Sequence, residues 1–214
     1  AAASHTGSLA GEDRVFDAVV RQYGVVRARN EEHMLDTVDV LSACALPEGK
    51  GIGIVTQSGG AGVLMADRAE ELGLDVPVLA PDTQKALQAV IPGFGAAGNP
   101  VDITGQFLAQ PSLLTESARI VMQDPKVHVG IFWLQLMHSQ TDKLVSIFAE
   151  IKAKATKPFV VAWVAAPEAG IRKLRELGIP VLRGAEPAVE AVAGLMQYAD
   201  ARRRWQADAA TREA

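Results

Sequence analysis

The chain has little of several residue types on which common architectures depend. Cys44 is the only cysteine among its 214 residues. A single cysteine excludes an intrachain disulfide and a zinc site built from paired cysteines. Proteins that use no disulfide are typical of a reducing compartment, so we expect a cytoplasmic protein.

Long apolar runs and an excess of basic residues are missing as well. No apolar stretch approaches the ~20 residues that cross a bilayer. The formal net charge of −4 provides no positive field for nucleic acid or for an anionic membrane surface. Residues 202–204 are three arginines in a row, which we interpret as charge favoured at the C-terminal end of a helix. We therefore expect neither a nucleic-acid nor a membrane partner.

The chain does have enough apolar content for a large core, since hydrophobic residues make up 49% of it. From residue 51 onward, short runs rich in Val and Ile alternate with helical patterns. We expect strands at 51–56, 75–80, 127–134, 158–164 and 179–182, and helices near 61–72, 82–91, 111–123, 140–155, 168–177 and 185–205. Strands and helices that alternate in this way predict a parallel sheet with right-handed crossovers.

The strands read as continuous apolar runs, as strands do when helices cover both faces of a sheet. Five such strands favour the flavodoxin-like order 2-1-3-4-5. In that order the ligand crevice lies at the carboxyl ends of strands 1 and 3. The predicted fold class is therefore α/β, with a flavodoxin-like parallel five-stranded sheet and helices on both of its faces.

The first 45 residues have a different pattern. We expect a helix from Glu12 to Gly24, a short strand at 25–28, and a second helix from Asn30, its cap, to about residue 43. This unit is too small to fold by itself, and the chain opens without an initiator Met. We interpret residues 1–45 as the tail of an upstream α/β domain, and residues 50–205 as a domain that folds alone.

A glycine-rich segment follows the first predicted strand and opens a helix. Glycines let the backbone approach a ligand closely, and a helix N-terminus offers free N–H groups to an anion. The candidate phosphate-binding residues are Ser58, Gly59, Gly60, Ala61 and Gly62. The alternative is that these glycines serve only the geometry of the turn. Asp82 has the spacing of a ribose-binding acid, but it is better explained as part of a helix cap.

A second candidate is the long loop at residues 92–105. Long loops in compact domains are disproportionately functional. Asn99, Asp102 and Thr104 provide side chains that could hydrogen-bond to a ligand. The alternative is that these side chains satisfy backbone groups of their own loop.

A third candidate is His5, which lies among three hydroxyl side chains and two glycines at residues 4–11. A neutral imidazole can attack a phosphoryl group and carry it as phosphohistidine. The alternative is a solvated histidine with no role. The other histidines are dispersed and lack metal-ligand spacing, although His138 follows the third predicted strand and would lie at the crevice.

Taken together and in this order, residues 4–11, 54–64 and 99–105 resemble three motifs of the NDP-forming acyl-CoA synthetases, relatives of succinyl-CoA synthetase. Residues 4–11 are similar to the phosphohistidine loop of that family. Residues 54–64 are similar to the start of its second flavodoxin-like domain, and residues 99–105 to a further signature within it. The resemblance extends over nearly the whole chain.

The resemblance implies a reaction in three steps. An acyl-CoA and phosphate form an acyl phosphate, the phosphoryl group moves to His5, and a nucleoside diphosphate accepts it. The intact enzyme would use ATP or ADP, Mg²⁺, CoA and a small carboxylic acid. Its CoA-binding and ATP-grasp domains would lie outside these residues, so we expect this piece to be inactive alone and to bind at most phosphate.

Two other functions remain open at this stage. The chain could be the ligase-like regulatory half of a protein acetyltransferase, although such halves often lack the histidine. It could also be a flavodoxin-like module that binds a phosphorylated ligand such as FMN at residues 58–62. The sequence indicates neither the acyl group nor the choice between ADP and GDP.

Overall fold

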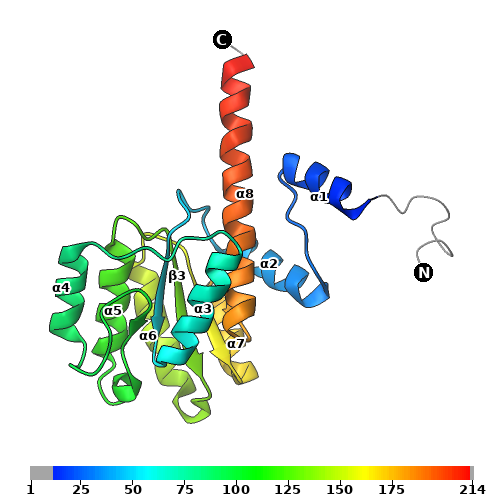
Figure 1. The fold of residues 1–214 in the computed structure, drawn as a ribbon. Coiled ribbons are helices and arrows are strands. Elements are labelled where there is room, and N and C mark those ends of the chain that lie inside the picture. The colour runs from blue at the N-terminus through cyan, green and yellow to red at the C-terminus, as the bar shows by residue number, and fades with distance from the viewer. Residues whose placement is uncertain (1–11, 213–214) are drawn as a thin grey trace.

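A computed structural model describes residues 12–212 as an α/β body from which one long helix extends (Figure 1). The five strands are β1 (Ile52–Thr56), β2 (Val101–Asp102), β3 (Val129–Gln135), β4 (Phe159–Val164) and β5 (Val181–Leu182). They pair in parallel in the order β2-β1-β3-β4-β5. The flavodoxin-like order predicted from the sequence is confirmed.

The helices closely follow the predicted pattern. They are α1 (Asp13–Gln22), α2 (Glu31–Ala43), α3 (Gly59–Glu71), α4 (Pro81–Val90), α5 (Ser112–Gln123), α6 (Thr141–Lys154), α7 (Glu168–Glu176) and α8 (Ala185–Arg212), with short 3-10 turns η2 (Gly105–Leu108) and η3 (His138–Gln140). The expected cap of α2 is present, since Asn30 Oδ1 accepts a 2.8 Å hydrogen bond from the His33 N–H. In the part of the chain that the structure describes, no helix is long and apolar enough to cross a membrane.

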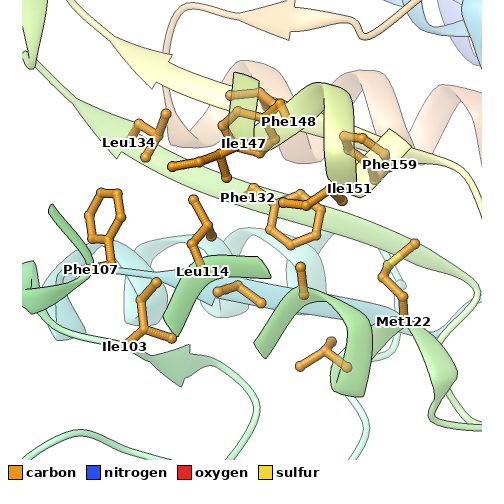
Figure 2. Packing of buried hydrophobic residues seen from close by; sticks show 14 of the residues in the cluster. Ile103, Phe107, Leu114, Met122, Phe132, Leu134, Ile147, Phe148, Ile151 and Phe159 are labelled. Atoms are coloured by element: carbon orange, nitrogen blue, oxygen red, sulfur yellow. The ribbon is translucent and has the colours of Figure 1, made fainter. Parts of the chain in front are cut away.

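Side chains alternate along the strands between two cores, one on each face of the sheet. Ile52 and Ile54 of β1 face α3 and α8, whereas Val55 faces the helices of the other side. On that other side, Phe132 of β3 lies at the centre of an aromatic group, with ring centroids 5.9 Å from Phe148 and 5.2 Å from Phe159 (Figure 2). The sheet is therefore buried on both faces, as its continuous apolar strands indicate.

The prediction of a strand at residues 75–80 is wrong. Only Asp75 pairs there, as an isolated bridge to Gly51. Pro77 has no N–H to donate, and the chain turns outward at Val78, which is 73% exposed. The second strand is instead the two-residue β2, inside the segment predicted to be a loop.

The predicted strand at residues 25–28 is also absent, because this segment is irregular and pairs with no strand. The residue that follows this segment nevertheless contacts α8. Arg29 forms an ion pair with the buried Glu190 of α8, which also binds Arg68 of α3 at 2.6 Å. The next helix, α2, packs on α8, and its Val40 is fully buried in the core beneath α3 and α8. Helix α2 thus shares a core with the sheet.

Candidate functional site

The candidate site lies at the carboxyl ends of the strands, where the loops after β1 and β2 meet. Thr56 at the end of β1 pairs with Asp102 at the end of β2. Two segments that are more than forty residues apart in sequence are thereby side by side. This is the edge at which parallel α/β sheets bind ligands.

The turn from β1 into α3 is held by a threonine side chain. Thr56 Oγ1 accepts a 2.9 Å hydrogen bond from the Ser58 N–H and donates one of 3.0 Å to the Ser58 carbonyl. Thr56 is buried, and Ser58, which precedes the helix, makes no capping bond with its own side chain. Helix α3 therefore begins without a side chain that occupies its first N–H groups.

Among residues 12–212, no side chain bonds to three backbone N–H groups at the start of α3, which are therefore available to a ligand. An α-helix cannot bond its first N–H groups internally, and here these belong to Gly59, Gly60 and Ala61. The Gly62 N–H bonds to the Ser58 carbonyl at 3.1 Å, so Gly62 is not a donor to a ligand. The first turn contains no acidic residue, and the helix dipole places partial positive charge there. This end of α3 can hold an anion.

The glycines of this turn have different roles. A side chain at Gly60 would find only Ser58 Oγ within 4 Å, and Gly59 is likewise exposed. A Cβ atom at Gly62 would lie 2.9 Å from Pro100 Cβ, so glycine is needed there for α3 to pack against the loop before β2. Gly59 and Gly60 therefore provide access to the site, and Gly62 provides packing.

Asp102 faces the start of α3. Its Oδ1 accepts a 2.9 Å hydrogen bond from the Thr104 N–H. Its Oδ2 lies 3.5 Å from the position that a Cβ would take at Gly59. Thr104 has a φ of 61°, which is strained for a β-branched residue, and its Oγ1 accepts from the Gln106 N–H at 3.3 Å. Both side chains serve the geometry of their loop, and the second carboxylate oxygen stays free to face a ligand.

Asn99 is placed away from the crevice. Its Oδ1 accepts from the Ile54 N–H at 2.9 Å, and its Nδ2 donates to the carbonyls of Ile52 at 2.8 Å and Pro77 at 3.1 Å. The amide thus bonds to backbone groups at the edge of β1 and is not available to a ligand. We assign Asn99 a structural role in the sheet.

The ends of β3 and β4 add strained backbone that the sequence analysis missed. Leu136, Met137 and Ala165 have φ values of 55°, 63° and 52°. The Leu136 carbonyl accepts from Trp163 Nε1 at 2.8 Å, and His138 Nε2 lies 2.7 Å from the Ala165 carbonyl. None of the three is a glycine or asparagine, which are the usual residues at positive φ. Strain of this kind gathers at functional sites.

Gln57 is a further site residue that sequence reasoning missed. Its Oε1 is buried and has no hydrogen-bond partner among residues 12–212. A buried carbonyl oxygen without a donor is costly, so this one is suited to accept a bond from a ligand or a neighbouring domain. Its one signal in the sequence is a polar residue directly after a buried strand.

Other candidates lie outside this edge. His5 falls outside the residues that the structure describes. Within those residues no group of three His, Cys, Asp or Glu side chains could hold a metal ion. Cys44 is largely buried, and burial raises the pKa of its thiol to about 11, so it is not a thiolate nucleophile near neutral pH.

Two family models match the chain. A model of the ligase-CoA domain matches residues 52–193, and a model of the succinyl-CoA ligase-like flavodoxin domain matches residues 1–41. The first covers the whole sheet and the second ends within α2. The two models thus match separate parts of the chain.

Several relatives of the chain are named as CoA ligases. The alpha subunit of acetate–CoA ligase (ADP-forming) I from Pyrococcus furiosus is 34% identical over 97% of this chain and 44% of its own length. The 4-hydroxybutyrate–CoA ligase (ADP-forming) of Nitrosopumilus maritimus is 28% identical over 94% of this chain and 29% of its own length. The chain spans less than half of either relative.

Solved structures agree with the sequence matches. The dinucleotide-forming acetyl-coenzyme A synthetase 1 of Ca. Korarchaeum cryptofilum, in complex with phosphate and ADP, superposes with a TM-score of 0.78. It is 26% identical to this chain, over 94% of this chain and 44% of the other. The arrangement of α3, β2 and the loops at the carboxyl edge thus belongs to a fold found in a protein whose complex contains phosphate and a nucleotide.

Proposed function

Because the chain belongs to the ligase-CoA family of NDP-forming acyl-CoA synthetases, we propose that it forms the phosphohistidine loop and second flavodoxin-like domain of such an enzyme. The whole enzyme would interconvert acyl-CoA, phosphate and ADP with a carboxylate, CoA and ATP. The observation that carries this proposal is the start of α3, where the N–H groups of Gly59, Gly60 and Ala61 face the carboxyl edge of the sheet.

The proposed reaction has three balanced steps. Phosphate oxygen attacks the thioester carbonyl of the acyl-CoA, and the CoA thiolate leaves. A ring nitrogen of His5 then attacks phosphorus, and the P–O bond to the acyl group breaks to release the carboxylate. Finally, an oxygen of ADP attacks phosphorus, and the P–N bond breaks to restore the imidazole. His5 is the phosphoryl carrier, and α3 stabilises the charge on the phosphoryl group.

The side chains around α3 would shape this site. Asp102 brings a negative charge close to Gly59. Its carboxylate can accept a hydrogen bond from an imidazole N–H. Gln57 can accept a hydrogen bond through its unpaired Oε1. Mg²⁺ would be held by phosphate oxygens of the bound nucleotide.

The partners of this piece would be the CoA-binding and ATP-grasp domains, in the same polypeptide or in another subunit. Helices α1 and α2 expose large apolar side chains, which is evidence that a neighbouring domain packs against them. Val15, Phe16, Val19, Leu35 and Val38 are between 46% and 64% exposed. Apolar side chains that gather on a surface mark interaction sites. The acyl substrate would be a small carboxylic acid, the class to which acetate and 4-hydroxybutyrate belong.

Phosphate titration by calorimetry tests the observation on which this proposal rests. We expect weak, saturable binding of inorganic phosphate to the chain. In Gly60→Val the affinity should fall at least tenfold, because the added side chain excludes the anion from the N–H groups. Ala153→Val is the control, because Ala153 is exposed on α6 and lies outside the loops of the site. Equal affinities in the wild type and Gly60→Val would overturn the assignment of the anion site.

A further inference from the structure

A small cavity lies between α5 and α6, apart from the carboxyl edge. Its volume is about 130 Å³. Its floor consists of Ala118, Met122 and Ile151, all less than 7% exposed, and Ala155 closes one side. Figure 2 labels Met122 and Ile151 at the Phe159 end of the core. Two small side chains, Ala118 of α5 and Ala155 directly after α6, line the hollow.

The rim of the cavity has charged side chains, and their positive and negative charges cancel. Arg119 forms an ion pair with Glu116 at 2.8 Å, and Lys154 forms one with Glu150 at 2.8 Å. Each pair lies within one helix, so no ion pair spans the opening. With its charges paired in this way, the rim has no net charge with which to attract a cation or an anion.

The rim also has a neutral hydroxyl that is available to a ligand. The Thr156 hydroxyl is exposed and makes no side-chain hydrogen bond among the described residues. The cavity volume is close to that of the ~150 Å³ engineered apolar cavity that binds benzene. A single ring therefore fits the floor, and one neutral polar substituent can reach the hydroxyl.

We propose that the cavity between α5 and α6 is a binding site for a small uncharged molecule with one apolar ring and one hydroxyl group. The cavity shares no residue with the site at α3. Met122 connects it to the sheet, because its Sδ lies 2.6 Å from the position that a Cβ would take at Gly130 of β3. A ligand on Met122 would thus be separated from β3 by the Met122 side chain.

Phenol is the probe that fits this description, and the methyl resonances of Met122 and Ile151 report on it. In ¹H–¹³C spectra of the chain, we expect these two methyl signals to shift saturably with phenol in the millimolar range. Benzene should bind several-fold more weakly because it lacks the hydroxyl. Benzoate should bind at least tenfold more weakly because its charge finds no free partner.

Two variants and a control locate the site. Ala155→Leu fills the cavity and should lower the phenol affinity at least tenfold. Thr156→Val keeps the shape and removes the hydroxyl, so phenol should bind no better than benzene. Ala153→Leu adds the same side chain on the solvent face of α6 and should change nothing. Unshifted methyl signals at saturating phenol, or benzoate binding equal to that of phenol, would overturn the proposal.

Discussion

Asn99 Oδ1 accepts a 2.9 Å hydrogen bond from the Ile54 N–H, so a side-chain amide takes the place that a neighbouring strand would hold beside β1. The Ile52 N–H bonds to the Asp75 carbonyl at 2.8 Å, and the Ile103 N–H bonds to the Thr56 carbonyl at 2.9 Å. One edge of β1 is thus completed by three separate segments. The single amide of Asn99 fills the gap between the other two.

Asn99→Ala should therefore destabilise the chain more than an ordinary loop substitution. Three hydrogen bonds are lost, and buried backbone groups of β1 are left without partners, so we expect a loss of about 3 kcal/mol in the free energy of unfolding. Urea unfolding at neutral pH measures this. Gln110→Ala is the control, because Gln110 is exposed and should change stability by less than about 0.5 kcal/mol. A similar small change in Asn99→Ala would contradict the structural role.

Much of the fold could be predicted because apolar periodicity governs it. The strands β1, β3, β4 and β5 and all of the helices were found from patterns in the sequence. The second strand was missed because the run of Val and Leu at 75–80 looks like a buried strand, whereas only Asp75 pairs there. The real strand is two residues long, and its position depends on a side-chain bond from Asn99 that no periodic pattern records.

The candidate site was predictable only in part. The glycines before α3 carry a local signal, because free N–H groups and close approach follow from residue type. The strain at Leu136 and Ala165 carries none, since tertiary contacts impose it on residues that usually avoid positive φ. The division of roles between Gly60 and Gly62 depends on Pro100, which only the fold brings near.

Asp102→Asn should tighten phosphate binding at α3. The substitution removes a negative charge beside Gly59 while the amide oxygen can still accept the Thr104 N–H. Repulsion between charges about 5 Å apart in water is of order 1 kcal/mol, so we expect a five- to tenfold gain in affinity. Calorimetric titration at low ionic strength measures it. Weaker binding in Asp102→Asn would show that the carboxylate itself holds the ligand.

Because of Asp124, the free energy of unfolding should depend on pH in the acid range. Burial alone would raise its pKa, but hydrogen bonds from the Thr83 side chain and from the N–H groups of Lys126 and Ala80 outweigh burial and hold the pKa below its usual value. Because the folded-state pKa is depressed, the stabilisation is full above the unfolded pKa, about 3.9, and is lost as pH falls through the folded value.

The variant Asp124→Asn tests this. At pH 7 the free energy of unfolding of the variant should be about 2 kcal/mol lower than that of the wild type, because an amide can accept hydrogen bonds only through its oxygen. The difference should shrink as the pH is lowered below 4. A gap between variant and wild type that stays constant from pH 7 to pH 3 would rule out the ionised carboxylate as the source.

Residues 50–205 should fold alone, although less stably than the whole chain. Removing α2 uncovers the face of α8 that it packs on, and Val40 alone is worth about 2 kcal/mol when fully buried. A chain that begins at Val25 keeps α2 and should match the full-length stability. Near-ultraviolet circular dichroism and urea unfolding distinguish the outcomes. Loss of the near-ultraviolet signal in residues 50–205 would contradict the proposed domain boundary.

Direct labelling of the intact enzyme tests whether His5 carries the phosphoryl group. Incubation with radiolabelled ATP and Mg²⁺ should leave label on His5 that is lost in acid and stable in base, because a P–N bond has that lability. Phosphoserine at Ser4 or Ser8 would survive acid. His5→Asn removes the nucleophilic imidazole and should abolish both the label and acyl-CoA formation.

As a control for this labelling, the circular dichroism spectrum of His5→Asn should match that of the wild type, which shows that the variant is folded. An unlabelled and inactive wild type would support a regulatory, ligase-like protein instead. We expect acid-labile label on wild-type His5 and none in His5→Asn. Acyl-CoA formation by His5→Asn at the wild-type rate would contradict it.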